Sequence, residues 1–118
     1  MLIVEDELDT QKTLSYMLKG YTYVFCESDK QMKKILRESD VKLFIIDIGL
    51  RGLKNGIEII KELRQDDEYS KLPIICMTSY VNSQQKNNAR SAGVDEYLEK
   101  PFSKTTLLEV LKNYLTTA

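Results

Sequence analysis

The sequence contains no histidine and no tryptophan, and only two cysteines and two prolines among its 118 residues. Without histidine, the chain cannot form a serine–histidine catalytic triad, a histidine-ligated zinc site or a phosphohistidine. Cys26 and Cys76 lie far apart in the sequence, each inside an apolar run. This placement predicts reduced, buried thiols and argues against a disulfide framework or a metal cluster.

No strong charge of either sign and no long apolar run is present. The 17 basic and 18 acidic residues give a net charge of -1, which provides no field to hold a polyanion, so nucleic-acid binding by this chain is not expected. No segment approaches the length of a membrane span, and the first residues carry no secretory signal, so we expect no membrane partner and a cytoplasmic location. The length suits one domain over residues 1–118.

Short apolar runs alternate with segments of helical period along the whole chain. The expected strands lie at 2–4, 23–26, 43–46, 74–77 and 94–98, and the expected helices at 8–18, around 32–36, 57–64, 83–92 and 107–115. Ser28 with Gln31 is typical of a helix capping box, Ser103 is a second expected cap, and Gly20 and Gly93 are expected just beyond helix ends. The alternation predicts an α/β fold, a doubly wound parallel sheet with helices on both faces.

Polar residues follow four of the five expected strands. Glu5 and Asp6 follow the first, Asp47 the third, Thr78 and Ser79 end the fourth, and Lys100 ends the fifth. Ligands of such sheets bind at the carboxyl ends of the strands, so these side chains are expected to converge.

Converging carboxylates require a cation, and an oxygen-only set of ligands suits Mg²⁺. A phosphoryl group fits beside that ion. Asp47 is the expected nucleophile, forming an aspartyl phosphate, while Lys100 balances charge and Thr78 donates a hydrogen bond. Because the chain has no histidine, the phosphoryl donor must be another molecule.

Taken singly, most of these residues have an ordinary structural explanation. Glu5 and Asp6 also fit a solvated acidic pair at a helix start, Thr78 a strand residue satisfied by the backbone, and Lys100 a solvent-facing charge. Asp47 is the exception, because a carboxylate directly after four apolar strand residues needs a partner. The functional interpretation depends on the four strand ends taken together.

With these residues in place, the sequence resembles the receiver domain of two-component response regulators over essentially its whole length. The runs that carry the resemblance are Val4-Glu5-Asp6-Glu7, Leu43 to Ile48, Met77-Thr78-Ser79 and, most specifically, Asp95 to Phe102. The resemblance implies a flavodoxin-like, five-stranded parallel sheet of order 2-1-3-4-5. It also implies a phosphoacceptor that is no enzyme toward other substrates and only catalyses its own phosphorylation and dephosphorylation.

The resemblance assigns further roles. Glu5, Asp6, Asp47 and the backbone carbonyl of Gly49 would hold Mg²⁺. Thr78 and Ser79 would bind the phosphoryl group with Lys100, the bond before Pro101 would be cis, and Tyr97 would be a switch aromatic, although a half-exposed strand tyrosine is an alternative.

Partners implied by the family are a histidine kinase or phosphotransfer protein, and an output domain or downstream protein. The family's usual partner face is formed by the fourth helix, fifth strand and fifth helix. The segment from Val81 to Ser91 is poor in large apolar residues, so phosphorylation is expected to shift this helix and its flanks.

The chain departs from the family pattern after Asp47. Arg51 replaces the usual proline, one extra residue separates Asp47 from Gly56, and Gly49 carries no side chain to screen an acyl phosphate. A different bulge over 49–55 and an altered phosphoryl lifetime are therefore expected.

Two other functions are compatible with parts of the sequence. A flavin-binding electron carrier shares this fold, but its phosphate loop would have to replace the acidic run Glu5 to Asp9. A receiver-like interaction module that works without phosphorylation is the other alternative, and the intact acidic pair, Asp47, Thr78 and Lys100 argue against it.

Overall fold

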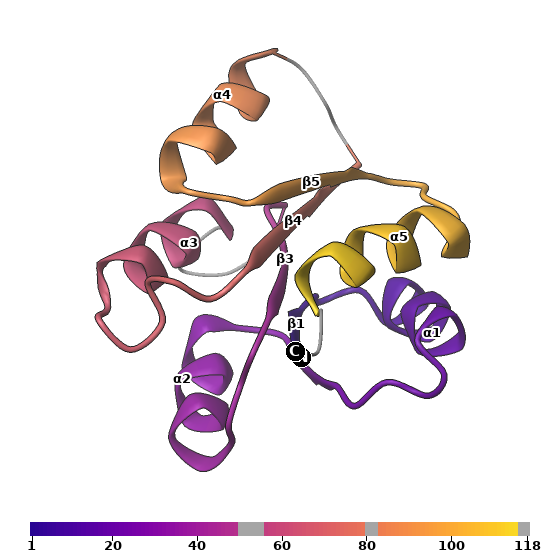
Figure 1. Ribbon diagram of the computed structural model, residues 1–118, viewed down its shortest axis with the longest axis horizontal. Helices are drawn as coiled ribbons and strands as arrows, with labels where there is room; N and C mark the ends of the chain where they lie inside the picture. Colours follow the sequence, from indigo (N-terminus) through magenta and orange to yellow (C-terminus); the bar gives the residue numbers. More distant parts are fainter. Residues whose placement is uncertain (50–55, 80–82, 116–118) are drawn as a thin grey trace.

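A computed structural model describes residues 1–49, 56–79 and 83–115, and Figure 1 shows their arrangement. The strands are β1 (Leu2–Val4), β2 (Val24–Cys26), β3 (Phe44–Asp47), β4 (Ile74–Thr78) and β5 (Glu96–Glu99). The helices are α1 (Leu8–Met17), α2 (Asp29–Glu38), α3 (Gly56–Gln65), α4 (Ser83–Ala92) and α5 (Lys104–Tyr114). All four strand pairings are parallel and the order is β2-β1-β3-β4-β5, which confirms the predicted sheet.

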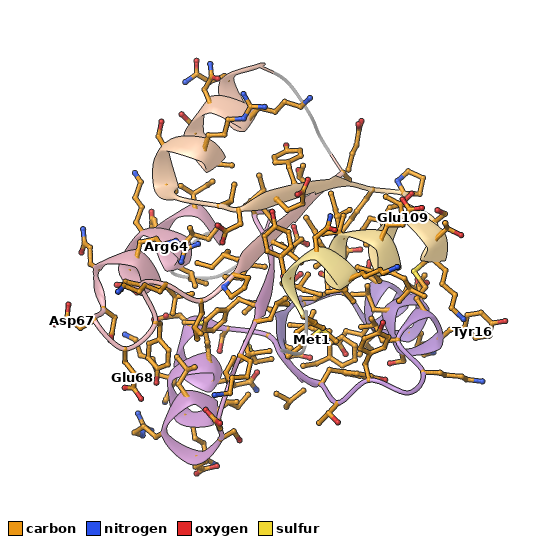
Figure 2. All side chains as sticks on the ribbon, viewed as in Figure 1. Met1, Tyr16, Arg64, Asp67, Glu68 and Glu109 are labelled. Atoms are coloured by element: carbon orange, nitrogen blue, oxygen red, sulfur yellow. The ribbon has the colours of Figure 1, made fainter. Side chains whose placement is uncertain are left out.

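The helices cover the sheet on both faces, as predicted, with α2, α3 and α4 on one face and α1 and α5 on the other (Figure 1). Alternate residues along each central strand point to opposite faces, so β4 sends Ile74 and Cys76 to the first core and Ile75 and Met77 to the second. The side chains in Figure 2 fill both layers between sheet and helices. Burial on both faces explains why these strands are continuously apolar.

Helix ends form where the sequence predicts them. The Ser28 hydroxyl accepts from the Gln31 amide, and the Gln31 side chain accepts from the Glu27 amide, one residue before the position of a standard capping box. Ser103 accepts from the Thr106 amide. Gly20 and Gly93 have φ values of +92° and +108°, which confirms the predicted left-handed residues after α1 and α4.

Some strands begin at a later residue than the sequence predicts. The sequence predicts a fifth strand from Val94, but β5 begins at Glu96, because the Val94 amide instead donates to the Ala89 carbonyl in the last turn of α4, at 3.3 Å. Cys26 and Cys76 are free and buried, which confirms the predicted reduced, buried thiols, and burial raises the pKa of both to about 12. Among the described residues, no helix has the length and apolar character needed to span a bilayer.

Candidate functional site

The carboxyl end of β1 places Glu5 inside the protein and Asp6 beside it. Glu5 has no exposed surface, and its amide continues the sheet by donating to the Cys26 carbonyl. The start of α1 holds Glu5 from the other side: the Glu7 amide donates to Glu5 Oε2 at 3.2 Å, and Gln11 Nε2 donates to the Glu5 carbonyl at 2.7 Å. The Glu5 carboxylate is therefore fixed in place, whereas Asp6 is half-buried at the rim.

Asp47 is the last residue of β3 and only 6% exposed. Its Oδ1 accepts a hydrogen bond of 2.8 Å from the Gly49 amide. Its Oδ2 accepts one of 3.0 Å from Lys100 Nζ. A backbone amide and an ammonium group thus orient the carboxylate.

Lys100 comes directly after β5 and connects two strand ends across the sheet. Its Nζ donates to Glu5 Oε1 at 2.7 Å as well as to Asp47, and its amide donates to the Thr78 carbonyl at 2.7 Å. The peptide bond between Lys100 and Pro101 is cis. The lysine therefore lies between a fully buried and a nearly buried carboxylate.

The three carboxylates form a group that could bind a hard divalent cation. Glu5, Asp6 and Asp47 each offer an oxygen atom, and these atoms all lie within 4.8 Å of one another. Carboxylate oxygens at this spacing suit Mg²⁺, which is bound by few protein ligands and retains several waters. The residues present therefore fit the ion that the sequence implied.

The electrostatics of this site favour the binding of positive charge. Burial, with a contribution from the charge of Asp47, raises the pKa of Glu5 to about 7, although the hydrogen bond from Lys100 acts in the opposite direction. Burial would lower the pKa of Lys100, but its hydrogen bonds to Glu5 and Asp47 outweigh this, and its pKa is raised. The cluster holds positive charge in two forms: the ammonium group of Lys100 and, near neutral pH, a proton on Glu5 in part of the molecules.

The two hydroxyl residues at the end of β4 are in different environments. Thr78 is 4% exposed and lies beside the strand end of Asp47, since Asp47 pairs with Met77 in the sheet. Ser79 is exposed and borders a groove of about 360 Å³ between α1 and the segment from Lys100 to Phe102. Thr78 is therefore the better placed of the two toward the carboxylates.

Tyr97 lies on β5 with a partly exposed ring and a buried hydroxyl oxygen. Its hydroxyl oxygen makes no hydrogen bond to the described residues, and burial raises its pKa, while the nearby Thr78 side chain acts in the opposite direction. Lys86 of α4 lies over the ring, with Nζ 5.9 Å from its centroid. Tyr97 thus contacts both the strand end of the site and α4.

The loop after Asp47 is only partly described. Gly49 lies beside the carboxylate, and a Cβ atom built on it would be 3.4 Å from Asp47 Oδ1. The expected bulge over 49–55 and the effect of Arg51 lie, from residue 50 on, outside the described residues. In the described part of this loop, the backbone amide of Gly49 reaches the site.

The structure brings Glu5, Asp6, Asp47 and Lys100 together and places Thr78 and Tyr97 next to them. Ser79 is exposed and borders the groove that Lys100 also lines. Sequence reasoning missed Gln11, which holds the Glu5 carbonyl. A glutamine on a helix one turn beyond an acidic pair carries no signal that would have singled it out.

Comparisons with known proteins agree with this geometry. The family model of the response regulator receiver domain matches residues 1–112. The aerobic respiration control protein ArcA of Escherichia coli K12 is 36% identical, over 98% of this chain and 48% of ArcA. The polar-differentiation response regulator DivK of Brucella ovis is 28% identical, over 98% of this chain and 94% of DivK.

A solved structure extends the comparison to the site. The receiver domain of a sensor histidine kinase from Pseudomonas aeruginosa PAO1 superimposes with a TM-score of 0.85 at 25% identity, covering 96% of this chain and 93% of that domain. That crystal structure has a magnesium ion coordinated in its active-site cleft. The chain thus spans about half the length of ArcA, but nearly all of DivK and of this solved domain.

Proposed function

The chain belongs to the response regulator receiver domain family of two-component signalling, and from this premise we propose that it accepts a phosphoryl group on Asp47. The observation that carries the proposal is the position of Lys100 Nζ between Glu5 and Asp47, in a group of three carboxylates within 4.8 Å of one another. This arrangement supports Asp47 as the nucleophilic carboxylate, Lys100 as a fixed cation, and the group of three carboxylates as a site for a second, metal cation. We take residues 1–118 as one such domain.

The transfer is a single exchange of bonds at phosphorus. A carboxylate oxygen of Asp47 attacks the phosphorus of a phosphohistidine on a histidine kinase or phosphotransfer protein, forming a P–O bond while the donor's P–N bond breaks. The electron pair of that bond stays on the imidazole nitrogen, which takes up a proton. The product is an aspartyl phosphate in this chain and an unmodified histidine in the donor, which is one step of a phosphorelay.

The side chains around Asp47 position the reacting groups and offset charge. Mg²⁺, held by Glu5, Asp6, Asp47 and the Gly49 carbonyl, would supply charge neutralisation for the phosphoryl oxygens. Lys100 already donates to Asp47 and would donate to a phosphoryl oxygen bound there, and the Thr78 hydroxyl is a further donor. Water attack on the same phosphorus would reverse the modification, so catalysis is limited to the domain's own phosphorylation and dephosphorylation.

Phosphorylation is proposed to act on the partner face formed by α4, β5 and α5. Tyr97 supports this, because its hydroxyl lies near Thr78 at the site while its ring lies under Lys86 of α4. A change in the position of Thr78 would therefore reach α4 through one aromatic ring. An output domain or downstream protein would bind this face, in the cytoplasm.

Mass spectrometry of the intact chain after incubation with acetyl phosphate and Mg²⁺ tests the proposal. We expect the mass of one added phosphoryl group, removable by hydroxylamine, and none in Asp47→Asn or when the metal is chelated. Asp67→Asn, an exposed acid in the turn after α3 (Figure 2), is the matched control and should be labelled like the wild type. Labelling that persists in Asp47→Asn would overturn the assignment.

A further inference from the structure

Arg64, in the last turn of α3, forms the most extensive side-chain hydrogen-bond network of the described residues outside the site. Nη1 donates to the carbonyls of Ser70 at 2.9 Å and Leu72 at 2.7 Å, and Nε donates to the Gly93 carbonyl at 2.8 Å. Nη2 forms an ion pair of 2.6 Å with Asp95 Oδ2. Three of the four acceptors are backbone carbonyls, so the planar guanidinium fixes chain segments rather than side chains.

These bonds join α3, on which Figure 2 labels Arg64, to the α4–β5 connection. Asp95 Oδ2 also accepts from the Ile74 amide at 2.8 Å, which links the connection to the start of β4. From the other face of the sheet, the Tyr114 hydroxyl of α5 donates to the Asp95 carbonyl at 3.1 Å. The start of β5 is therefore held from both faces, at the end of the sheet opposite Asp47.

Gly93 is the joint between this fixed segment and α4. Its φ is +108°, and its amide donates to the carbonyls of Ala89 and Arg90 in the last turn of the helix. A Cβ on Gly93 would come within 2.8 Å of Arg64 Cγ. The arginine stem thus packs directly against the residue at which α4 ends.

The remainder of α4 is weakly held. Among its described side chains, Ala89 and Ala92 are buried and both are small, while Gln84, Lys86, Asn87 and Asn88 are exposed. Little apolar area holds a helix of this composition to α3 and the sheet, so its opening free energy is expected to be low. The described buried side chains of α4 therefore lie in its carboxyl-terminal half.

We propose that Arg64 is a positioning residue that fixes the carboxyl end of α4 to α3 and to the start of β5, so that α4 rearranges by pivoting at Gly93. The part of the inference that concerns phosphorylation depends on the function proposed above, whereas the anchor itself does not. Phosphorylation at Asp47 then moves the amino-terminal half of α4 most, and the partner face changes by rotation about a fixed point rather than by displacement of the whole helix.

Hydrogen exchange of the full chain, with and without Mg²⁺ and beryllofluoride as the phosphoryl mimic, tests both parts. The reporters are the amides of Gly93, Val94 and Asp95, all of which are hydrogen bonded. In Arg64→Met without mimic, we expect these amides to exchange about tenfold faster relative to the β3 amides, which report global opening. Arg64→Lys keeps the charge but loses the planar set of guanidinium donors, so it should show most of this increase. Lys61→Met removes an exposed charge from the same helix and should not speed exchange at these amides.

With mimic, exchange in wild type should change over residues 84–88 and stay constant at 93–95. In Arg64→Met the change should extend to 93–95. The anchor is disproved if Arg64→Met speeds exchange at 93–95 no more than at β3, and the pivot is disproved if the mimic alters 93–95 in wild type as much as 84–88. A mimic that leaves the Gly49 and Lys100 amides of wild type unchanged would count against the proposed function alone, since the comparison without mimic still decides the anchor.

Discussion

At the scale of single residues, Glu5 is a carboxyl group whose pKa depends strongly on its surroundings. Its pKa in the folded protein is about 7, against an ordinary value of 4.5, because the carboxyl group is buried next to Asp47. The folded state therefore binds more protons than the unfolded state between these two values. The contribution of Glu5 to stability is greatest at low pH and is lost as the pH rises from about 4.5 through about 7, by an amount on the order of 3 kcal/mol.

Urea unfolding of metal-free protein at several pH values checks this sign. Other carboxylates act in the opposite direction at low pH, so Glu5→Gln is the necessary comparison. We expect the variant to gain stability relative to wild type as the pH rises through 7, because its amide needs no proton. Parallel profiles for the two proteins across this range would show that the Glu5 carboxyl is not perturbed.

Lys100 should matter most when Glu5 is ionised. Lys100→Met leaves Glu5 and Asp47 close together without a cation, so we expect a loss of about 2 kcal/mol at pH 8 and a smaller loss at pH 6, where Glu5 is protonated. Phosphorylation by acetyl phosphate should also slow. Lys42→Met is the matched control, because its ion pair with Asp40 is exposed and worth little. Equal losses at the two pH values would contradict the electrostatic explanation.

The sequence predicted which residues meet at the site but not how they contact one another. Carboxyl ends of parallel strands share one edge, and this rule places Glu5, Asp47 and Lys100 together from strand assignments alone. The rule does not state that Glu5 is fully buried, or that one ammonium group reaches both acids. Those features depend on side-chain packing between segments 53 and 95 residues apart, which have no local signature.

At the scale of elements, the start of α3 is packed directly against the end of β3. A Cβ on Gly56 would lie 2.4 Å from the Asp47 carbonyl oxygen and 2.6 Å from Ile48 Cα, both of which are backbone atoms that cannot turn away. Gly56→Ala therefore requires β3 and α3 to separate. We expect a loss of about 1–3 kcal/mol in urea unfolding, together with weaker Mg²⁺ binding because Asp47 moves.

Gly20→Ala distinguishes crowding from backbone strain. Gly20 has a φ of +92°, but a Cβ on this residue would have no atom within 4 Å, so the substitution should cost about 1–2 kcal/mol through its left-handed backbone alone. Because Gly20 is remote from the carboxylates, the affinity for Mg²⁺ should not change. Weaker Mg²⁺ binding in both variants would mean that the effect of Gly56→Ala comes from lower stability and not from displacement of Asp47.

The elements themselves were predictable because each has a local cause. Apolar β-branched runs form the strands, and Ser28, Ser103 and Gly93 mark helix ends by hydrogen bonding and φ preference. The network of Arg64 was not predictable, since three of its acceptors are backbone carbonyls and any residue provides one. The first residue of β5 was also not predicted, because the Val94 amide donates a hydrogen bond to the Ala89 carbonyl of α4.

At the scale of the whole molecule, the carboxylate site lies at the carboxyl ends of the strands that separate the two cores. The central strands send alternate residues to both cores, and the same strands end at Glu5, Asp47 and Thr78. Repulsion among the acids therefore acts on the strands that both cores share. Any ligand that offsets this repulsion should stabilise the entire fold and not just a loop.

Mg²⁺ is the ligand for which this coupling can be measured. A metal that binds only the folded state stabilises it by about 1.4 kcal/mol at ten times its Kd, and by about 1.4 kcal/mol more for each further tenfold. We expect the thermal midpoint to rise with Mg²⁺ concentration and to fall again on chelation, while NaCl at matched ionic strength has a smaller effect.

Variants of the carboxylates test whether the ion binds at this site. Asp6→Asn and Asp47→Asn each remove one negative charge from the cluster and should abolish the dependence of the midpoint on Mg²⁺, because the remaining acids bind the ion weakly. Asp67→Asn, which removes an exposed charge after α3, should retain it. A midpoint that rises equally in wild type and Asp6→Asn would place the ion elsewhere, and a midpoint that does not rise in wild type would show that these three carboxylates are not a metal site.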